Sequence, residues 1–415
     1  MLLINKFFHD GARAGGVGRH VLQLRDLLEQ QGHEVIPFGM RDEDTPTDLP
    51  TYEFFVSQKE FDGTGSFMQK IGAIGTMFWS YEAAHELHAL IDATRPDVAH
   101  VHNEYHHLSP SILQVLRDRG IPVVQTAHDY KRIVPQYAFY PQDVRGEAAN
   151  NMHGIRYEPQ QRPWLHRAAL WSSFTFHKLI GIYERDIAVT LVPSRFMHDQ
   201  FVAYGQDPAQ LQVWPLPRPM DLVADLPNFE SRSGLLYVGR LSEEKGLHVF
   251  LRAFAELPED KRPHLTLLGD GPQRAALEQL VHDKQLASHV TFKGHVSKEE
   301  VGNSMRAARL LILPSLVCES YGLVVLEAAA NGLPAIVSNR GPLPELVEDG
   351  RGWTMAMENP SSIAKSLQNI DYKQAWERAQ QKVVVWVSDE ERSPLSYVRK
   401  LEQLYADLQS ARTTR

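Results

Sequence analysis

Short apolar runs alternate with longer helical patterns along the whole chain, and this alternation restricts the fold more than any other feature. It indicates βαβ units and parallel sheets. We expect strands at residues 2–7, 34–38, 98–101, 123–126, 190–193, 235–238, 265–268, 290–292, 310–313 and 335–337. We expect helices at residues 19–31, 109–119, 248–257, 273–284, 298–307 and 321–331. The predicted fold class is α/β, with two doubly wound parallel-sheet domains.

The domain boundary is predicted from chain length and proline content. A chain of 415 residues exceeds one ordinary hydrophobic core. Residues 213–229 contain four prolines, which disfavour regular structure and indicate an interdomain connection. We therefore expect domains at 1–216 and 217–395. The tail at 396–415 has helical periodicity and could pack on either domain, the first included.

The composition excludes several classes of protein. The net charge is −8 and no long basic run is present, so no nucleic-acid partner is expected. The single cysteine excludes a disulfide framework and a cysteine-based zinc site. The N-terminal run MLLINKFF is shorter than a signal peptide, and no segment reaches the roughly 18–20 apolar residues of a membrane span. We expect a cytoplasmic protein.

The segment ESYGLVVLE, residues 319–327, follows a buried-strand pattern and begins a helix. Gly322 lies near the predicted helix start, where free N–H groups and the helix dipole suit a phosphate. Glu319 and Glu327 suit the hydroxyls of a sugar or ribose, so the segment suggests a nucleotide sugar. We reject two alternatives: an acid/base pair of a hydrolase, and Glu327 as a plain surface residue, because its flanks are apolar.

Two further loops follow predicted strands of the second half. The run YVGRLSEEKG places Gly239 and Arg240 at a strand end and Lys245 before a helix, where two cations could neutralise a diphosphate. The alternative is a solvated loop with weak surface ion pairs. The run LLGDGP places Gly269 and Gly271 where backbone groups could line a nucleotide pocket, or simply form a tight turn.

Polar strand ends also occur in the first half, and together with the others they predict one cleft between two facing domains. The loop DGARAGGVGRH includes Gly16 but no GxGxxG fingerprint, so it indicates either close approach to a phosphate or a tight turn. His128 ends a strand and could contact a sugar or serve structure alone. A cluster of histidines surrounds another strand end, for which a metal is conceivable but acceptor contact or packing is preferred: His100, His102, His106 and His107. No metal ion is expected to be required.

Residues 162–182 mix aromatic, aliphatic and basic side chains at helical spacing. A membrane-facing helix is one interpretation. The apolar positions cover more than one stripe of the helix, which favours a core helix. Peripheral contact of the protein with the inner membrane face is kept as an alternative.

With these motifs in place, the chain resembles retaining glycosyltransferases of the GT-B fold, in particular glycosyltransferase family 4. The resemblance rests on VGRLSEEKG, LLGDGP, FKGHV and LPSLVCESYGLVVLEAAANGLPAIVSN, and in the first half on GGVGRH, PDVAHVHN, TAHDY and VPSRF. It departs from the family at Tyr321, where phenylalanine is common, and at residues 339–345, where a second glycine is missing. No cysteine-containing insert is present at 136–157, whose role stays unassigned.

The resemblance implies roles for individual residues. Glu319, Arg240, Lys245 and His128 would be catalytic, with Glu319 on the donor-sugar hydroxyls and the two cations on the diphosphate. Donor binding would involve Gly16, Gly239, Gly269, Gly271, His295, Val296, Tyr321, Gly322, Leu323 and Glu327. At the acceptor we expect Asn103, Glu104 and Tyr130.

The expected activity is transfer of a hexosyl group, with retention, from a UDP-, GDP- or ADP-sugar to an acceptor hydroxyl. A saccharide or lipid-linked saccharide acceptor in bacterial envelope or exopolysaccharide synthesis fits the resemblance, and the domains 1–216 and 217–395 would serve acceptor and donor. The alternatives are a GT-B epimerase or phosphorylase, or a nucleotide-sugar-binding protein without catalysis.

Overall fold

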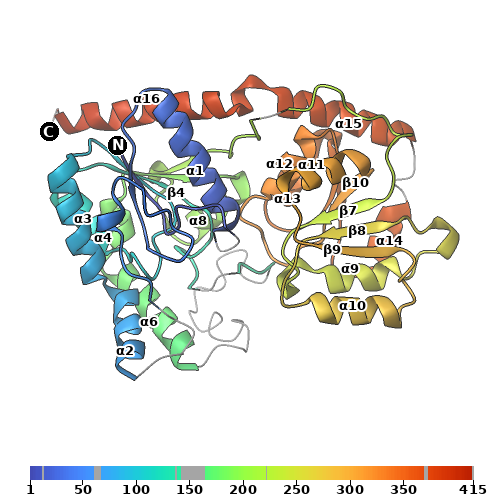
Figure 1. Cartoon of the computed structure of the whole chain (residues 1–415), viewed down its shortest axis with the longest axis horizontal. Helices are drawn as coiled ribbons and strands as arrows, with labels where there is room; N and C mark the ends of the chain where they lie inside the picture. Colours follow the sequence, from blue (N-terminus) through green and yellow to red (C-terminus); the bar gives the residue numbers. More distant parts are fainter. Residues whose placement is uncertain are drawn as a thin grey trace. The chain divides into compact units, whose positions relative to one another are not determined.

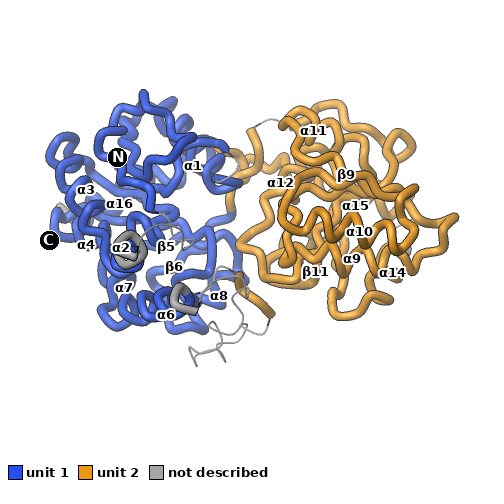
Figure 2. The backbone as a smooth tube through the Cα atoms, turned by 60° about the horizontal axis from the view of Figure 1, so that its bottom comes forward, with its two compact units in different colours: residues 1–137, 142–215, 395–415 blue, residues 138–141, 216–394 orange. Residues whose placement is uncertain are grey.

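The computed structural model describes residues 1–11, 14–59, 67–135, 138–141, 164–220, 222–368 and 373–413. The chain forms two compact units (Figure 2). Unit 1 comprises residues 1–137, 142–215 and 395–415, and unit 2 comprises residues 138–141 and 216–394. Most of the segment 136–157 lies outside the described residues.

Unit 1 is built on a parallel six-stranded sheet. Its strands are β1 (Leu2–Ile4), β2 (Ile36–Phe38), β3 (Ala99–Val101), β4 (Val123–Thr126), β5 (Val189–Val192) and β6 (Leu211–Val213). Their order is β2-β1-β3-β4-β5-β6. The order reverses between β1 and β3, and the crevice at such a reversal is where open α/β sheets bind ligands.

Helices cover both faces of this sheet (Figure 1). The helices of unit 1 are α1 (Gly15–Gln30), α2 (Phe67–Phe78), α3 (Tyr81–Thr94), α4 (Ser111–Asp118), α6 (Trp164–Leu179), α7 (Ile182–Asp186), α8 (Arg195–Ala203) and α16 (Pro394–Thr413), of which α2 and α6 pack against each other. One face packs against α3, α4 and α7 through residues such as Leu87 and Ile112. The other packs against α1 and α16 through Leu24 and Leu401, so the last helix completes the core of unit 1.

Unit 2 contains a second parallel six-stranded sheet. Its strands are β7 (Leu235–Val238), β8 (Leu265–Leu268), β9 (Val290–Gly294), β10 (Leu310–Leu313), β11 (Ala335–Ser338) and β12 (Gly352–Met355). The order β12-β11-β10-β7-β8-β9 is that of a dinucleotide-binding sheet, and it reverses between β7 and β10. The loops that follow these two strands therefore meet at one crevice.

The helices of unit 2 also lie on two faces. They are α9 (Leu247–Phe254), α10 (Arg274–Asp283), α11 (Lys298–Ala307), α12 (Leu323–Ala330), α13 (Leu343–Val347), α14 (Pro360–Gln368) and α15 (Lys373–Ser388). The core on one face includes Phe250, Leu277 and Ile363 from α9, α10 and α14. The core on the other includes Met305 and Val325 from α11 and α12.

The predicted fold class is confirmed, with two parallel sheets flanked by helices. Two strands were missed for identifiable reasons. The edge strand β6 has two exposed residues of three, so it lacks a buried-strand pattern. The edge strand β12 begins with glycine and has one buried residue of four. Helices α2, α3, α7, α8, α13, α14 and α15 were not predicted individually.

Candidate active site

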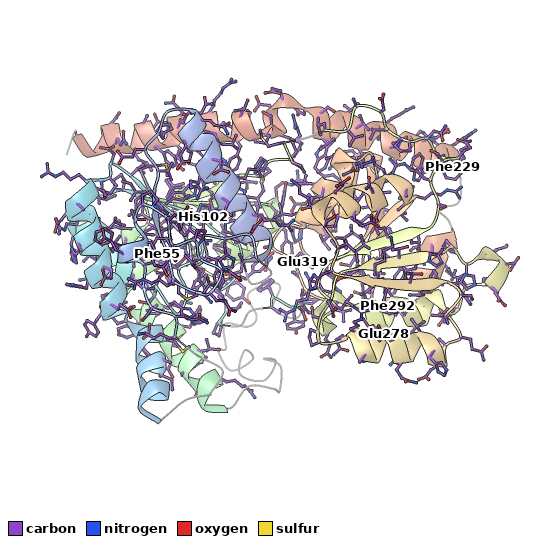
Figure 3. All side chains as sticks on the ribbon, in the orientation of Figure 1. Phe55, His102, Phe229, Glu278, Phe292 and Glu319 are labelled. Atoms are coloured by element: carbon purple, nitrogen blue, oxygen red, sulfur yellow. The ribbon has the colours of Figure 1, made fainter. Side chains whose placement is uncertain are left out.

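Two of the three residues predicted as catalytic in unit 2, Lys245 and Glu319, meet at the point where its strand order reverses. Lys245 ends a 3-10 turn (Glu243–Lys245) after β7, and Glu319 lies in the loop after β10. The Lys245 ammonium Nζ contacts Glu319 Oε1 at 2.8 Å and Oε2 at 3.0 Å. Glu319 is labelled in Figure 3. The two side chains remain 26% and 16% exposed, so a ligand can reach both.

The local environment keeps Glu319 ionised. Burial alone would raise the pKa of this carboxyl, but the charge and hydrogen bonds of Lys245 outweigh it. The Ser315 hydroxyl donates a further hydrogen bond to Glu319 Oε1. The pKa of Glu319 therefore lies below its ordinary value, and the carboxylate can accept hydrogen bonds from sugar hydroxyls at neutral pH.

Backbone contacts connect the loops that carry this pair. The Leu316 N–H donates to the Glu244 carbonyl at 2.8 Å, which joins the loop after β10 to the turn after β7. The Arg340 guanidinium donates to the Leu316 carbonyl from the loop after β11. In the segment 339–345, which lacks the second glycine common in the family, an arginine therefore contacts the loop after β10.

Helix α12 begins beside Glu319. Its N-cap is Gly322, with φ 104°, and a Cβ there would lie 2.8 Å from a methyl carbon of Leu343. Only glycine combines this backbone angle with this closeness. The Tyr321 side chain is buried, which raises its pKa to about 12, so this residue can offer a ligand only its backbone. Glu327 lies half-buried in the second turn, as its apolar flanks predict.

The glycine loops after β7 and β8 pack tightly together. A Cβ on Gly269 would lie 2.0 Å from the Gly239 carbonyl oxygen, at φ 123°, so the loops could not approach with any larger residue. Gly271 lies in the same loop as Gly269. Arg240, directly after Gly239, is exposed.

The residues predicted to face the base follow β9. His295 is exposed, whereas Val296 is half-buried and packs against the core beneath α11 and α12. Leu323, the first residue of α12, is half-buried and packs against the same core. All predicted donor-binding residues except Gly16 thus belong to unit 2, whereas Gly16 lies in the first turn of α1 in unit 1.

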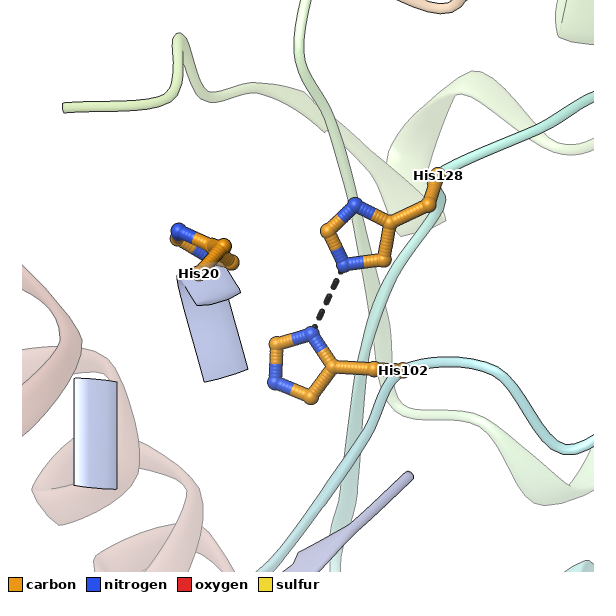
Figure 4. A group of neighbouring side chains, drawn as sticks. All are labelled: His20, His102 and His128. Atoms are coloured by element: carbon orange, nitrogen blue, oxygen red, sulfur yellow. Dashed lines mark hydrogen bonds between the residues drawn. The ribbon is translucent and has the colours of Figure 1, made fainter. Parts of the chain in front are cut away.

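His128 of unit 1 belongs to a buried histidine cluster (Figure 4). His128 Nε2 and His102 Nδ1 lie 2.8 Å apart. His20 of α1 approaches both rings, with centroids 5.8 Å from His102 and 5.6 Å from His128. His100 stacks on His102 with centroids 4.3 Å apart and bonds through its two nitrogens to Tyr405 and Thr126.

Burial holds these imidazoles neutral. Desolvation lowers the pKa of His20 to about 4 and that of His100 to about 3. It also lowers the pKa values of His102 and His128 well below the ordinary value, assisted by the neighbouring rings. His128 would therefore act through hydrogen bonds rather than through positive charge.

Among the described residues of unit 1, two groups have ring nitrogens or carboxylate oxygens close enough to hold a metal ion. One is His20, His102 and His128, and the other is His9, Asp42 and Asp44, each with its candidate ligand atoms within 4.8 Å of one another. In the second group His9 Nε2 already contacts Asp42 Oδ2 at 3.0 Å. Neither group was predicted as a ligand set from sequence.

The predicted acceptor residues differ in accessibility. Asn103 is half-buried, and its backbone N–H donates to Asn5 Oδ1 at 3.2 Å. Glu104 is fully buried and accepts from Gln125 Nε2 at 3.0 Å. Burial raises the pKa of Glu104 to about 8, so it is mostly protonated at pH 7. Tyr130 is also buried, so neither Glu104 nor Tyr130 is open to an acceptor in this structure.

Their chain neighbours instead line a small pocket of about 50 Å³ in unit 1. Tyr105 and Lys131 contribute a cation–π contact of 5.0 Å, and Lys178 enters from α6. Aromatic faces and ammonium groups together suit a sugar ring with an anionic substituent. The sequence missed this pocket because α6 is far from these residues along the chain.

Sequence reasoning also missed Ser315 and His20. Ser315 comes shortly after the apolar run 310–313, in the motif LPSLVCESYGLVVLE. His20 is the last residue of the motif GGVGRH, of which only the glycines were interpreted. Position at a strand or helix end was the available signal for both.

Comparison with known proteins assigns the chain to a family. The sequence model "Glycosyltransferase Family 4" matches residues 14–221, and "Glycosyl transferases group 1" matches residues 222–381. The chain belongs to glycosyltransferase family 4. Its fold is therefore GT-B, and the protein is a glycosyltransferase.

Individual relatives are distant. The chain is 27% identical over 387 residues to glycogen synthase of Mycobacterium tuberculosis, covering 86% of this chain and 82% of that protein. It is 26% identical over 288 residues to sulfoquinovosyl transferase SQD2 of Arabidopsis thaliana, covering 65% of this chain and 48% of that protein.

Solved structures share the fold. Sucrose-phosphate synthase from Thermosynechococcus elongatus superposes with a TM-score of 0.72 at 22% identity, with 99% of each chain covered. HepE of Anabaena, solved with UDP and glucose, has a TM-score of 0.66 at 16% identity, covering 98% of this chain and 99% of that one.

Proposed function

We propose that this glycosyltransferase moves a hexosyl group from a nucleotide diphosphate sugar to an acceptor hydroxyl with retained anomeric configuration. The observation that carries the proposal is the accessible Lys245–Glu319 pair at the strand-order reversal of unit 2, beside the start of α12. It combines a cation, a helix N-terminus and a carboxylate, which match a diphosphate and the hydroxyls of a sugar.

In the proposed reaction, Glu319 holds the hydroxyls of the donor sugar. Lys245, Arg240 and the backbone N–H groups at Gly322 and Leu323 stabilise negative charge on the departing diphosphate. The acceptor oxygen bonds to the anomeric carbon on the face from which the diphosphate leaves. A phosphate oxygen takes the acceptor proton, so no covalent sugar–enzyme intermediate and no metal ion are needed.

The donor is a UDP-, GDP- or ADP-sugar. HepE of Anabaena has been solved with UDP-glucose, which makes a UDP-hexose the first candidate. The acceptor is a saccharide or lipid-linked saccharide of bacterial envelope or exopolysaccharide synthesis, bound on unit 1 at the pocket of Tyr105 and Lys131. Two relatives, a glycogen synthase and an alpha-monoglucosyldiacylglycerol synthase, are named for a polysaccharide and a glycolipid product.

A cytoplasmic location with peripheral membrane contact belongs to the same proposal. No helix among the described residues is long and apolar enough to span a bilayer. On α6, however, Leu179 is 81% exposed and lies beside the exposed Lys178. An apolar and a basic side chain together suit an anionic lipid surface. Flotation with anionic vesicles should weaken in Leu179→Glu, and equal flotation of both proteins would reject this part.

A donor panel and a product assay test the function. UDP-, GDP- and ADP-hexoses are compared by thermal shift, since a ligand of the folded state raises Tm. The stabilising donor is then incubated with saccharide acceptors, and release of free nucleotide should require the acceptor. Proton NMR of the product gives the anomeric configuration. Inverted product, or turnover without acceptor, would contradict the proposal.

A further inference from the structure

The contact between His102 and His128 is the most informative polar feature that the proposed reaction leaves unexplained. Their facing nitrogens are 2.8 Å apart, which is a hydrogen-bond distance. Two nitrogens bound to one zinc ion at about 2.0–2.1 Å lie about 3.3 Å apart in tetrahedral geometry. The pair is therefore arranged as a hydrogen bond between two imidazoles and not as two ligands of one metal ion.

A hydrogen bond between two neutral imidazoles uses one proton and allows two arrangements. In the first, His102 carries its proton on Nδ1 and donates it, so His128 carries its own proton on Nδ1. In the second, His128 donates from Nε2, and His102 then carries its proton on Nε2. The two arrangements present opposite groups at His128 Nδ1: an N–H donor or a bare acceptor.

The surroundings of His102 distinguish these arrangements. His102 Nε2 is buried and has no hydrogen-bond partner in the described part of the chain. The second arrangement would place an N–H there with no acceptor, and buried donors left in this way are rare in folded proteins. The first arrangement places no proton on His102 Nε2, so no buried N–H group is left without an acceptor.

The free nitrogen of His128 is placed for a ligand. His128 Nδ1 makes no hydrogen bond to any described residue, and it is not among the buried nitrogens that lack a partner. The residue as a whole remains 9% exposed. Its position directly after β4 lies at the carboxyl edge of the sheet, where ligands of such folds bind.

We propose that His102 is a positioning residue that donates its Nδ1 proton to His128 Nε2 and so holds His128 as an Nδ1–H donor toward bound substrate. This inference rests on the proposed function only in its last part, the contact with substrate. His102 is held in place by its stack on His100, and the hydrogen bond between His100 Nε2 and the Thr126 hydroxyl orients that ring.

The tautomer can be measured without any substrate. In protein labelled with ¹⁵N-histidine, protonated and bare ring nitrogens give separate signals, and the His128 signals are those lost in His128→Gln. We expect a protonated Nδ1 and a bare Nε2 for His128 in the wild type. A proton on Nε2, or a mixture of the two tautomers, would overturn the proposal even if no variant at position 102 folds.

Variants at position 102 add a second readout. His102→Phe keeps the ring and removes the donor, so the His128 signals should shift toward the other tautomer. His102→Asn places an amide N–H at nearly the position of Nδ1 and should restore the wild-type signals. Tyr405→Phe removes a hydroxyl from the same stack without touching His128 and is the matched control. Unchanged His128 signals in His102→Phe would also overturn the proposal.

Kinetics connect the tautomer to function. We expect His102→Phe to lower kcat/KM for the donor about tenfold, with His102→Asn and Tyr405→Phe within about threefold of the wild type. Equal loss in Tyr405→Phe would show a general packing effect and reject the positioning role. If the wild type transfers no sugar but shows the expected tautomer, the proposed function fails and the His102–His128 assignment stands.

Discussion

The carboxyl edges of the two sheets carry opposite kinds of polar chemistry. In unit 1 the strand ends hold buried groups in their neutral forms, the imidazoles of His102 and His128 and the carboxyl of Glu104. In unit 2 they hold an accessible ion pair, Lys245 and Glu319. The same parallel-sheet architecture therefore supports neutral hydrogen bonding in one unit and charge stabilisation in the other.

Depth of burial produces the difference. His102 and Glu104 lie within the core, where ionisation would cost much solvation energy. Burial therefore lowers the pKa of His102 and raises that of Glu104, and both side chains stay uncharged at pH 7. Lys245 and Glu319 lie on loops, keep contact with solvent and stabilise each other's charge. Unit 1 should consequently respond to pH through its stability, and unit 2 through its ligand binding.

The largest expected effect is loss of stability of unit 1 between pH 7 and pH 5. The pKa values of His20 and His100 are lowered to about 4 and about 3, so the unfolded chain binds protons below its ordinary pKa of 6.5 while the folded chain does not. Stability present above pH 6.5 is therefore lost on acidification, by about 2 kcal/mol for each of these histidines at pH 5. Because its pKa is raised, Glu104 stabilises unit 1 on acidification and offsets the loss of stability from about one histidine.

Hydrogen exchange read by mass spectrometry tests this, with rates corrected for the intrinsic effect of pH. Peptides from β1, β3 and β4 should lose protection between pH 7 and pH 5, while peptides from β7, β8 and β10 keep it. His20→Phe should reduce the loss, whereas replacement of His282, 85% exposed, should not. Parallel loss of protection in both units would break the comparison.

The next effect concerns the ion pair of unit 2. Glu319→Ala and Lys245→Ala should each lower kcat at least about a hundredfold with the fold intact, because each removes stabilisation of the transition state. The double variant should lose less than the product of the two effects, since the groups contact each other.

The exposed Lys373–Glu230 pair provides a matched control in the same unit. Lys373→Ala and Glu230→Ala make the same charge changes and should leave kcat within about twofold, as expected for a surface pair. Near-normal transfer by both Glu319→Ala and Lys245→Ala would show that this pair is not part of the active site.

A smaller effect is expected at Glu104. Its folded pKa of about 8 exceeds that of the unfolded chain, so its stabilising contribution is complete in acid and is lost as pH rises through 8. Glu104→Gln mimics the protonated acid and lacks this dependence. From pH 6 to pH 8, the free energy of unfolding of the variant should rise by about 2 kcal/mol relative to that of the wild type. Denaturant titrations at the two pH values measure the difference, and a constant difference would show that Glu104 is ionised in the folded state.

The contrast also explains what the sequence could reveal. Strands such as 235–238 and 310–313 were located without error because fully buried parallel strands are continuous apolar runs. Edge strands β6 and β12 were missed because they are partly exposed. The charged residues of unit 2 were recognisable since glycine and cations in strand-end loops form local motifs.

The site of unit 1 was less accessible to sequence reasoning. His20, His102 and His128 come from three separate segments, and their contacts depend on how the helices pack over the sheet. Burial of Glu104 and Tyr130 could not be read from a polar strand end, where the next residue, Tyr105, reaches the pocket instead. Periodicity locates elements, but it does not determine which of two adjacent side chains is exposed.

The smallest expected effect is that of metal removal, which we propose leaves transfer unchanged. Lys245, Arg240 and the start of α12 would supply the positive charge that a divalent ion supplies elsewhere. Initial rates should agree before and after EDTA treatment and exhaustive dialysis, and added Mg²⁺, Mn²⁺ or Zn²⁺ should not raise them. The variants His20→Phe and Asp44→Ala, one from each group that could hold an ion, serve to locate any effect. If EDTA lowers the rate of transfer and a divalent ion restores it, the enzyme requires a metal ion and this prediction is wrong. If the ion then fails to restore the rate in His20→Phe, the metal ion binds at the histidine cluster.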